Sequence, residues 1–173
     1  MNTKLITIGL LECLFSGLLT LLVVFLAYRI LQRIVYGKLQ PATNNPAFAV
    51  LAASVVLSIG MLMSEAIEPA MNTFTLLSAR ETDYALIALQ LVKNLSIYLG
   101  VALLAALFIN ACGIFAYTRM TSGVDEWSEI RAQNVGVALL TGVLIIVLTL
   151  TMKHGVGMLF EAWVPYPETP RFY

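Results

Sequence analysis

Five ionisable residues lie inside or at the ends of long apolar stretches, where charged side chains are rare. They are Glu12, Glu65, Lys93, Lys153 and His154. A charge within a bilayer is costly, so a charge found there indicates an ion or proton pathway, or a structural ion pair. A carboxylate can carry a proton, and histidine changes charge near neutral pH. One hypothesis is therefore an ion-responsive polar site, with Glu12 as the carrier and His154 as its pH-sensitive neighbour.

The same residues also have a structural interpretation, which we favour from the sequence. Glu12 lies about seven residues from the outer end of its apolar stretch, which is roughly 10 Å of helix. We expect it to be neutral or paired with Lys93 or Lys153, fixing the register of the helices. Lysine side chains near helix ends extend toward water.

No residue pattern indicates an enzyme, a metal site or a cofactor. His154 is the only histidine, whereas a zinc site needs several ligands at suitable spacing. Asp125, Glu126 and Glu129 are expected on a solvated surface helix capped by Ser122. Phosphate-binding glycine loops, nucleophile elbows and zinc-protease motifs do not occur in the sequence. The sequence thus predicts a protein without catalytic residues, metal ligands or cofactors.

The composition identifies lipid as the solvent of this chain. Of its 173 residues, 60% are hydrophobic and 12% are charged, and the mean hydropathy is +0.87. Soluble domains are about 45–50% apolar and about 25% charged. The net charge is zero, which gives no indication of a nucleic-acid partner. We therefore expect an integral membrane protein whose main partner is the bilayer.

Four stretches are long enough to cross a bilayer, which takes about 20 mostly apolar residues. They run from Leu5 to Tyr28, from Pro46 to about Ile67, from about Leu95 to Tyr117 and from about Val135 to Met152. The first is longer than the apolar part of a signal peptide, so we expect it to be retained. Because unpaired backbone groups are not tolerated in hydrocarbon, all four are predicted to be transmembrane helices of an all-α protein.

An offset of 89 positions aligns the chain with itself. Lys4 then meets Lys93, Ala27-Tyr28 meets Ala116-Tyr117, and three further pairs are Asn45 with Asn134, Ala49 with Ala138, and Ala53 with Gly142. Small residues four apart share a helix face and let membrane helices approach closely. The three pairs named last are predicted to be packing positions, and each Asn is expected to cap its helix. A conduction path along the same small faces is the alternative.

The repeat predicts two tandem hairpins in parallel orientation, related by a pseudo-twofold axis along the membrane normal. The expected parts are a first hairpin (1–74), an interfacial connector (75–93), a second hairpin (94–160) and an extended proline-rich tail (161–173).

The distribution of Arg and Lys predicts the orientation. The first and third loops hold Arg29, Arg33, Lys38, Arg119 and Arg131 and are placed in the cytoplasm, with both termini outside. Interfacial aromatic anchors are expected on the outer side, at Tyr84, Tyr98, Phe160 and Trp163.

The run Asp125 to Ile145, DEWSEIRAQNVGVALLTGVLI, resembles the YjfL-like bacterial inner-membrane proteins. The resemblance implies two tandem copies of a two-span domain of unknown function, located in the inner membrane. The acids before Asn134 match that pattern, whereas Asn45 in the first copy follows a segment without acids. The resemblance therefore bears on topology more than on function.

These observations predict a non-enzymatic inner-membrane protein that serves as an oligomeric scaffold or as an accessory subunit of a membrane complex. Homo-oligomers or other membrane subunits are the expected partners. The alternative is a small ion channel or a proton-coupled transporter with Glu12 in the path.

Overall fold

The computed structural model describes residues 3–37, 44–78, 84–121, 123 and 125–165, with only the backbone described at 3–9, 11, 12, 77, 78 and 84. The described part is built from helices, as predicted. In chain order they are α1 (Thr3–Tyr36), α2 (Pro46–Ser78), α3 (Tyr84–Met120), α4 (Glu126–Arg131) and α5 (Val135–Glu161).

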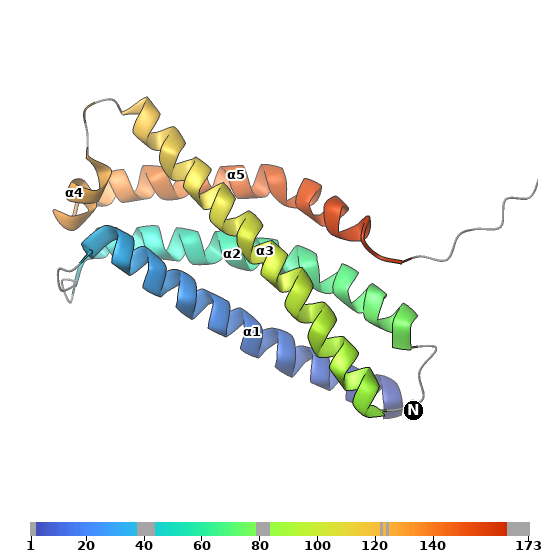
Figure 1. Ribbon diagram of the computed structural model, residues 1–173. Helices are drawn as coiled ribbons and strands as arrows, with labels where there is room; N and C mark the ends of the chain where they lie inside the picture. The colour runs from blue at the N-terminus through green and yellow to red at the C-terminus, as the bar shows by residue number, and fades with distance from the viewer. Residues whose placement is uncertain (1–2, 38–43, 79–83, 122, 124, 166–173) are drawn as a thin grey trace, which may run out of the picture.

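Four of these helices are long and apolar enough to cross a membrane. The qualifying segments are Cys13–Tyr36, Pro46–Leu76, Ala85–Met120 and Val135–Glu161. Helices α1 and α3 run toward the end where α4 lies, and α2 and α5 run back from it (Figure 1). The start of α1 and the end of α5 therefore lie at the same end of the bundle, as four crossings require.

Helices α2 and α3 are longer than the predicted spans, and they include most of the residues expected in the connector at 75–93. Residues 75–78 belong to α2, and residues 84–93 belong to α3 without a break before the predicted span. Pro69 lies inside α2, yet the helix continues to Ser78. The outer turns of α2 are held against α3, because Phe74 is buried and Thr73 hydrogen-bonds Tyr98. This packing favours a continued helix over an independent interfacial segment.

Helix α2 is the centre of the bundle. It packs along α5, and α3 crosses the face formed by α2 and α5 together (Figure 1). Helix α1 packs mainly against α2. A twofold axis that exchanges the two hairpins would exchange α1 with α3 and α2 with α5. Helix α1 would then pack on α5 in the same way as α3 packs on α2. The described helices do not follow that pattern, so the predicted pseudo-twofold packing is not the arrangement of this chain.

Small residues set the spacing between the core helices. A Cβ atom on Gly142 of α5 would lie 2.9 Å from Ser54 Cβ of α2. A Cβ atom on Gly113 of α3 would lie 2.8 Å from Ile145 Cγ1 of α5. Both distances are too short for van der Waals contact, so only glycine fits at these crossings. Between lipid-exposed helices, such close backbone approach replaces the hydrophobic effect as the source of association.

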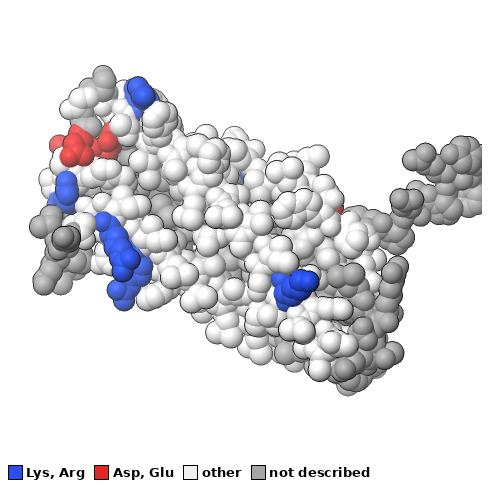
Figure 2. Space-filling model, in the orientation of Figure 1, with Lys and Arg blue, Asp and Glu red and all other residues white. Residues whose placement is uncertain are grey.

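Charged side chains gather toward the two ends of the bundle. On the face in Figure 2, basic and acidic residues cluster on the side of α4, and a broad uncharged region covers most of the remainder. Much of the outer surface of α1 is apolar, with Leu14, Leu18 and Leu21 all more than 60% exposed. A charged end followed by an apolar belt is the surface expected of a protein that crosses a bilayer.

Candidate functional site

The candidate site lies between α2 and α5, toward the end of the bundle opposite α4. Glu65 of α2 and Lys153 of α5 form an ion pair, with 3.0 Å between Oε1 and Nζ. Glu65 lies about 20 residues beyond Asn45, which is roughly 30 Å of helix. This length equals the thickness of a typical hydrocarbon core. With Asn45 at one boundary of the membrane, the ion pair would lie near the other.

Gly157 of α5 makes room for the Glu65 carboxylate. A Cβ atom at this position would lie 3.0 Å from Glu65 Oε2. The glycine sits one turn beyond Lys153, so one face of α5 supplies both the positive charge and the space that the carboxylate needs. A larger residue at position 157 would push against the carboxylate that Lys153 holds.

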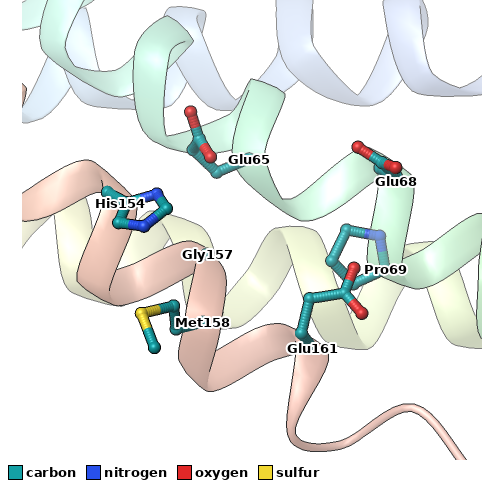
Figure 3. Close-up of a pocket in the computed structure, with 7 residues that line it drawn as sticks. All are labelled: Glu65, Glu68, Pro69, His154, Gly157, Met158 and Glu161. Carbon is teal, nitrogen blue, oxygen red and sulfur yellow. The ribbon is translucent and has the colours of Figure 1, made fainter.

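An open pocket of about 290 Å³ adjoins the ion pair. Figure 3 shows its walls, which come from α2 on one side and α5 on the other. The lining residues are Glu65, Glu68, Pro69, His154, Gly157, Met158 and Glu161. The pocket therefore combines three carboxylates and an imidazole with a partly apolar wall.

The structure brings together three of the five residues predicted for the polar site. Glu65, Lys153 and His154 meet at this pocket. Lys153 pairs with Glu65, whereas the sequence suggested Glu12 as its partner. Lys93 is exposed on α3 and is not part of the pocket lining. Glu12 belongs to α1, but its side chain is outside the described residues.

The side chains at this pocket do not resemble a metal centre. Among the residues that the structure describes, no group of three or more His, Cys, Asp or Glu side chains has an arrangement that could hold a metal ion. The two cysteines, Cys13 and Cys112, are free thiols.

Two asparagines cap helices at the α4 end, as predicted. Asn45 Oδ1 accepts a hydrogen bond of 2.9 Å from the Phe48 amide, and Asn134 Oδ1 accepts from the amides of Gly136 and Val137. The side chain of Asn45 also donates to the Ile130 carbonyl of α4 at 2.7 Å. One cap thus ties the start of α2 to the short helix before α5.

Helix α4 is the surface helix that the sequence predicted, but its cap differs from the expected one. The Asp125 side chain accepts from the Trp127 amide, which makes Asp125 the N-cap. Ser122, the predicted cap, is outside the described residues. Glu126 is buried and accepts a hydrogen bond from Thr121, so one of the three acids serves the fold rather than a solvated face.

The predicted packing positions differ in burial between α5 and α2. Ala138 and Gly142 are buried, whereas Ala49 and Ala53 are exposed. Helix α2 turns a neighbouring face toward α5, which carries Ser54. Because both faces of α2 contain small residues four apart, the spacing alone did not distinguish them.

Several core contacts were missed from the sequence. Ser58 and Thr149 share a buried hydrogen bond of 2.7 Å between α2 and α5. Tyr98 and Phe160 were expected as interfacial anchors, but both are buried and pack against each other, with ring centroids 5.8 Å apart and ring planes 60° apart. Trp163 is exposed and completes this aromatic cluster. The side chain of Tyr84 is outside the described residues, as is most of the predicted proline-rich tail.

Comparison with known proteins adds no further constraint on this site. No protein-family model, curated protein or solved structure matches the chain. Functional inference therefore depends on the geometry of the bundle and on the chemistry of its polar groups.

Proposed function

We propose that this chain is a multi-pass protein of the bacterial inner membrane that acts without catalysis, as an oligomeric scaffold or as an accessory subunit of a membrane complex. The observation that supports this most directly is the closed contact between α2 and α5. At Gly142 the contact leaves no room for a Cβ atom beside Ser54. This close contact supports a role of the small residues in helix association rather than in a conduction path.

The polar groups of the same seam are also used internally. Ser54 donates to the Val50 carbonyl, and Thr141 donates to the Val137 carbonyl. The Thr149 hydroxyl donates to the Ile145 carbonyl, so Ser58 is the donor in its bond to Thr149. Hydroxyls engaged in this way stabilise a helix contact rather than line a hydrated path.

Room for a partner exists on the outside of the bundle. Helix α1 is attached mainly to α2, and α2 keeps exposed small residues at Ala49 and Ala53. These surfaces are apolar and suit either lipid or another transmembrane helix. Their exposure supports an assembly with copies of this chain or with other membrane subunits.

The proposed orientation places the α4 end in the cytoplasm and both termini outside. Arg29 lies two turns before the end of α1 and Arg119 lies in the last turn of α3, with each guanidinium about 5 Å from the ring of a phenylalanine four residues earlier. Arg33 and Arg131 lie at the same end. Arginine near the ends of short loops favours the cytoplasmic side.

We also propose that the two hairpins arose by duplication, although they no longer pack symmetrically. Helices α2 and α5 begin at Pro46 and Val135, which are related by the 89-residue offset of the sequence repeat. The residue before each start is an Asn that caps the helix, and both caps lie at the α4 end. The two helices begin at equivalent positions of the repeat and have the same type of N-cap residue, which supports a common origin for α2 and α5.

Isolation of the protein with its neighbours tests the scaffold proposal. The full chain would be purified from native membranes after mild crosslinking, and companions identified by mass spectrometry. We expect a stable oligomer or a defined partner. A chain that stays monomeric, with nothing crosslinked to it above the level of an unrelated four-span protein, would contradict the proposal.

Proton- or ion-coupled transport is the second candidate, and the Glu65–Lys153 pair beside its pocket favours it. Glu12 would then lie in the path. Proton and cation flux into liposomes would be compared for the wild type and for Glu12→Gln. Flux above that of empty vesicles, lost in the variant, would support transport. Equal flux for the wild type and the variant, at the level of empty vesicles, would contradict the transport proposal.

A further inference from the structure

We propose that the Glu65–Lys153 ion pair is a latch over a proline hinge in α2, and that it sets the width of the pocket between the outer segments of α2 and α5. Three independent features of the structure meet at Glu65: an ion pair to another helix, a proline one turn later, and a glycine opposite its carboxylate. Each feature can be explained by packing alone. Together they mean that the backbone of α2 is least stabilised at Glu65, the residue that forms the ion pair with α5.

The hinge follows from the position of Pro69 inside α2. In a regular helix, the amide of residue 69 would donate to the carbonyl of residue 65. Proline has no amide hydrogen, and its ring crowds that carbonyl, so helices bend at such positions. The carbonyl that loses its intrahelical donor belongs to Glu65, whose side chain forms the ion pair.

The latch connects this hinge to α5. Glu65 Oε1 lies 3.0 Å from Lys153 Nζ, and the other carboxylate oxygen rests over Gly157. Both charged side chains are partly shielded, at 26% exposure for Glu65 and 38% for Lys153. Gly155 and Gly157 lie in the next turn of α5, and glycine is a weak helix former. Each helix is therefore pliable on the outer side of the ion pair.

The outer segments of the two helices share α3 as a support. Thr73 of α2 hydrogen-bonds Tyr98 at 2.8 Å, and the ring of Phe160 of α5 packs against the same tyrosine. The outer ends therefore stay near α3, and opening the latch would change the width of the pocket rather than detach a helix.

The charges around the latch favour opening once it is broken. Glu68 and Glu161 line the same pocket as Glu65, and Figure 3 shows them on opposite walls. His154 is the remaining ionisable group of the lining. With Lys153 in place, its ammonium offsets the carboxylate of Glu65. Without it, that carboxylate is left beside the carboxylate of Glu68 in the same pocket, and like charges repel.

Distances between spin labels measure the width of the pocket directly. One pair, at Thr75→Cys and Leu159→Cys, spans the outer segments, and both positions are exposed. A reference pair, at Leu57→Cys and Leu150→Cys, spans the same helices before the hinge and is also exposed. The full chain would be studied by double electron–electron resonance in nanodiscs.

We expect Lys153→Met to broaden or lengthen the distance distribution of the outer pair, about twofold in width, and to leave the reference pair unchanged. Glu65→Gln should have the same effect with a smaller amplitude, because it removes one of the repelling carboxylates. The charge exchange Glu65→Lys with Lys153→Glu should restore the distribution of the wild type. All samples would carry alanine in place of Cys13 and Cys112.

Two results would overturn the latch. An outer distribution that is unchanged in both single variants would show that the ion pair does not set the pocket width. Equal broadening of both label pairs would show general loosening of the bundle, with no hinge at Pro69. As a further check, Pro69→Ala should suppress the broadening caused by Lys153→Met, since it restores the missing backbone hydrogen bond. Persistence of the full broadening in this double variant also contradicts the proposal.

Discussion

Ser58 of α2 and Thr149 of α5 meet in the core, with their hydroxyl oxygens 2.7 Å apart and both side chains fully buried. Thr149 donates its only hydroxyl proton to its own helix, at the Ile145 carbonyl. Ser58 is therefore the donor between the helices. This bond is a polar link between the two helices that form the main seam of the bundle.

Loss of this link should destabilise the bundle modestly. Hydrogen bonds between membrane helices contribute about 0.6 kcal/mol on average and up to roughly 1.7 kcal/mol. We expect Ser58→Ala and Thr149→Val each to lower stability within that range, and the double variant to cost less than the sum of the two. Unfolding in a denaturing detergent would give the three values. Strict additivity would mean that the two hydroxyls do not interact.

The glycine at the centre of the seam should tolerate no side chain. Gly142→Ala places a methyl group against Ser54, and overpacking of this kind costs about 1–3 kcal/mol. Gly60→Ala is the matched control, because a Cβ atom there meets nothing within 4 Å. It should be neutral or stabilising, since alanine favours the helix. Thermal unfolding in detergent would separate the two, and a Gly142→Ala variant as stable as Gly60→Ala would contradict the close contact.

The difference between Ala53 and Gly142 shows what the sequence could not supply. Both were predicted as packing positions by the same repeat, but only Gly142 is buried. In a soluble protein, polarity distinguishes the outer face of a helix from the inner one. In a membrane helix both faces are apolar, so small-residue spacing marks several faces without saying which one meets a neighbour.

Features that depend on nearby residues were predictable, and those that depend on helix register were not. The asparagine caps and the starts of α2 and α5 follow from short local patterns. The sequence identified Glu65 and Lys153 as part of one polar layer, but it did not pair them. That pairing depends on how α2 and α5 align along their length, which is set by contacts such as Gly142 with Ser54.

The two helix-capping asparagines should differ in their contribution to stability. Asn45 is buried and also donates to the Ile130 carbonyl, whereas Asn134 is exposed and donates to Glu129. Loss of a cap costs about 0.5–2 kcal/mol, and loss of the additional hydrogen bond to Ile130 costs about 0.5–1.5 kcal/mol more, although the Ile130 carbonyl still accepts from the Gln133 amide. Asn45→Ala should therefore lower the unfolding temperature more than Asn134→Ala does. Equal shifts would argue against a structural role for the bond to Ile130.

Two buried tyrosines, one on α1 and one on α3, provide a matched test of the core. Tyr98 and Tyr36 are 4% and 5% exposed, and each has its ring near that of a phenylalanine. The Tyr98 hydroxyl bonds Thr73, whereas the Tyr36 hydroxyl is buried without a hydrogen-bond partner among the described residues. The same chemical change at the two positions therefore removes a hydrogen bond in one case and an unsatisfied polar group in the other.

We expect Tyr98→Phe to destabilise the protein by about 1 kcal/mol, because it also leaves the buried Thr73 hydroxyl without its partner. Tyr36→Phe should be neutral or stabilising, since burial of an unpaired hydroxyl is unfavourable. For a protein of this size, 1 kcal/mol corresponds to roughly 2–4 °C in Tm. Thermal unfolding of the two variants in one detergent would measure the difference, and each variant is the control for the other. If Tyr36→Phe proved the more damaging substitution, the hydroxyl of Tyr36 would have a partner, and the link between α2 and α3 at Tyr98 would contribute little to stability.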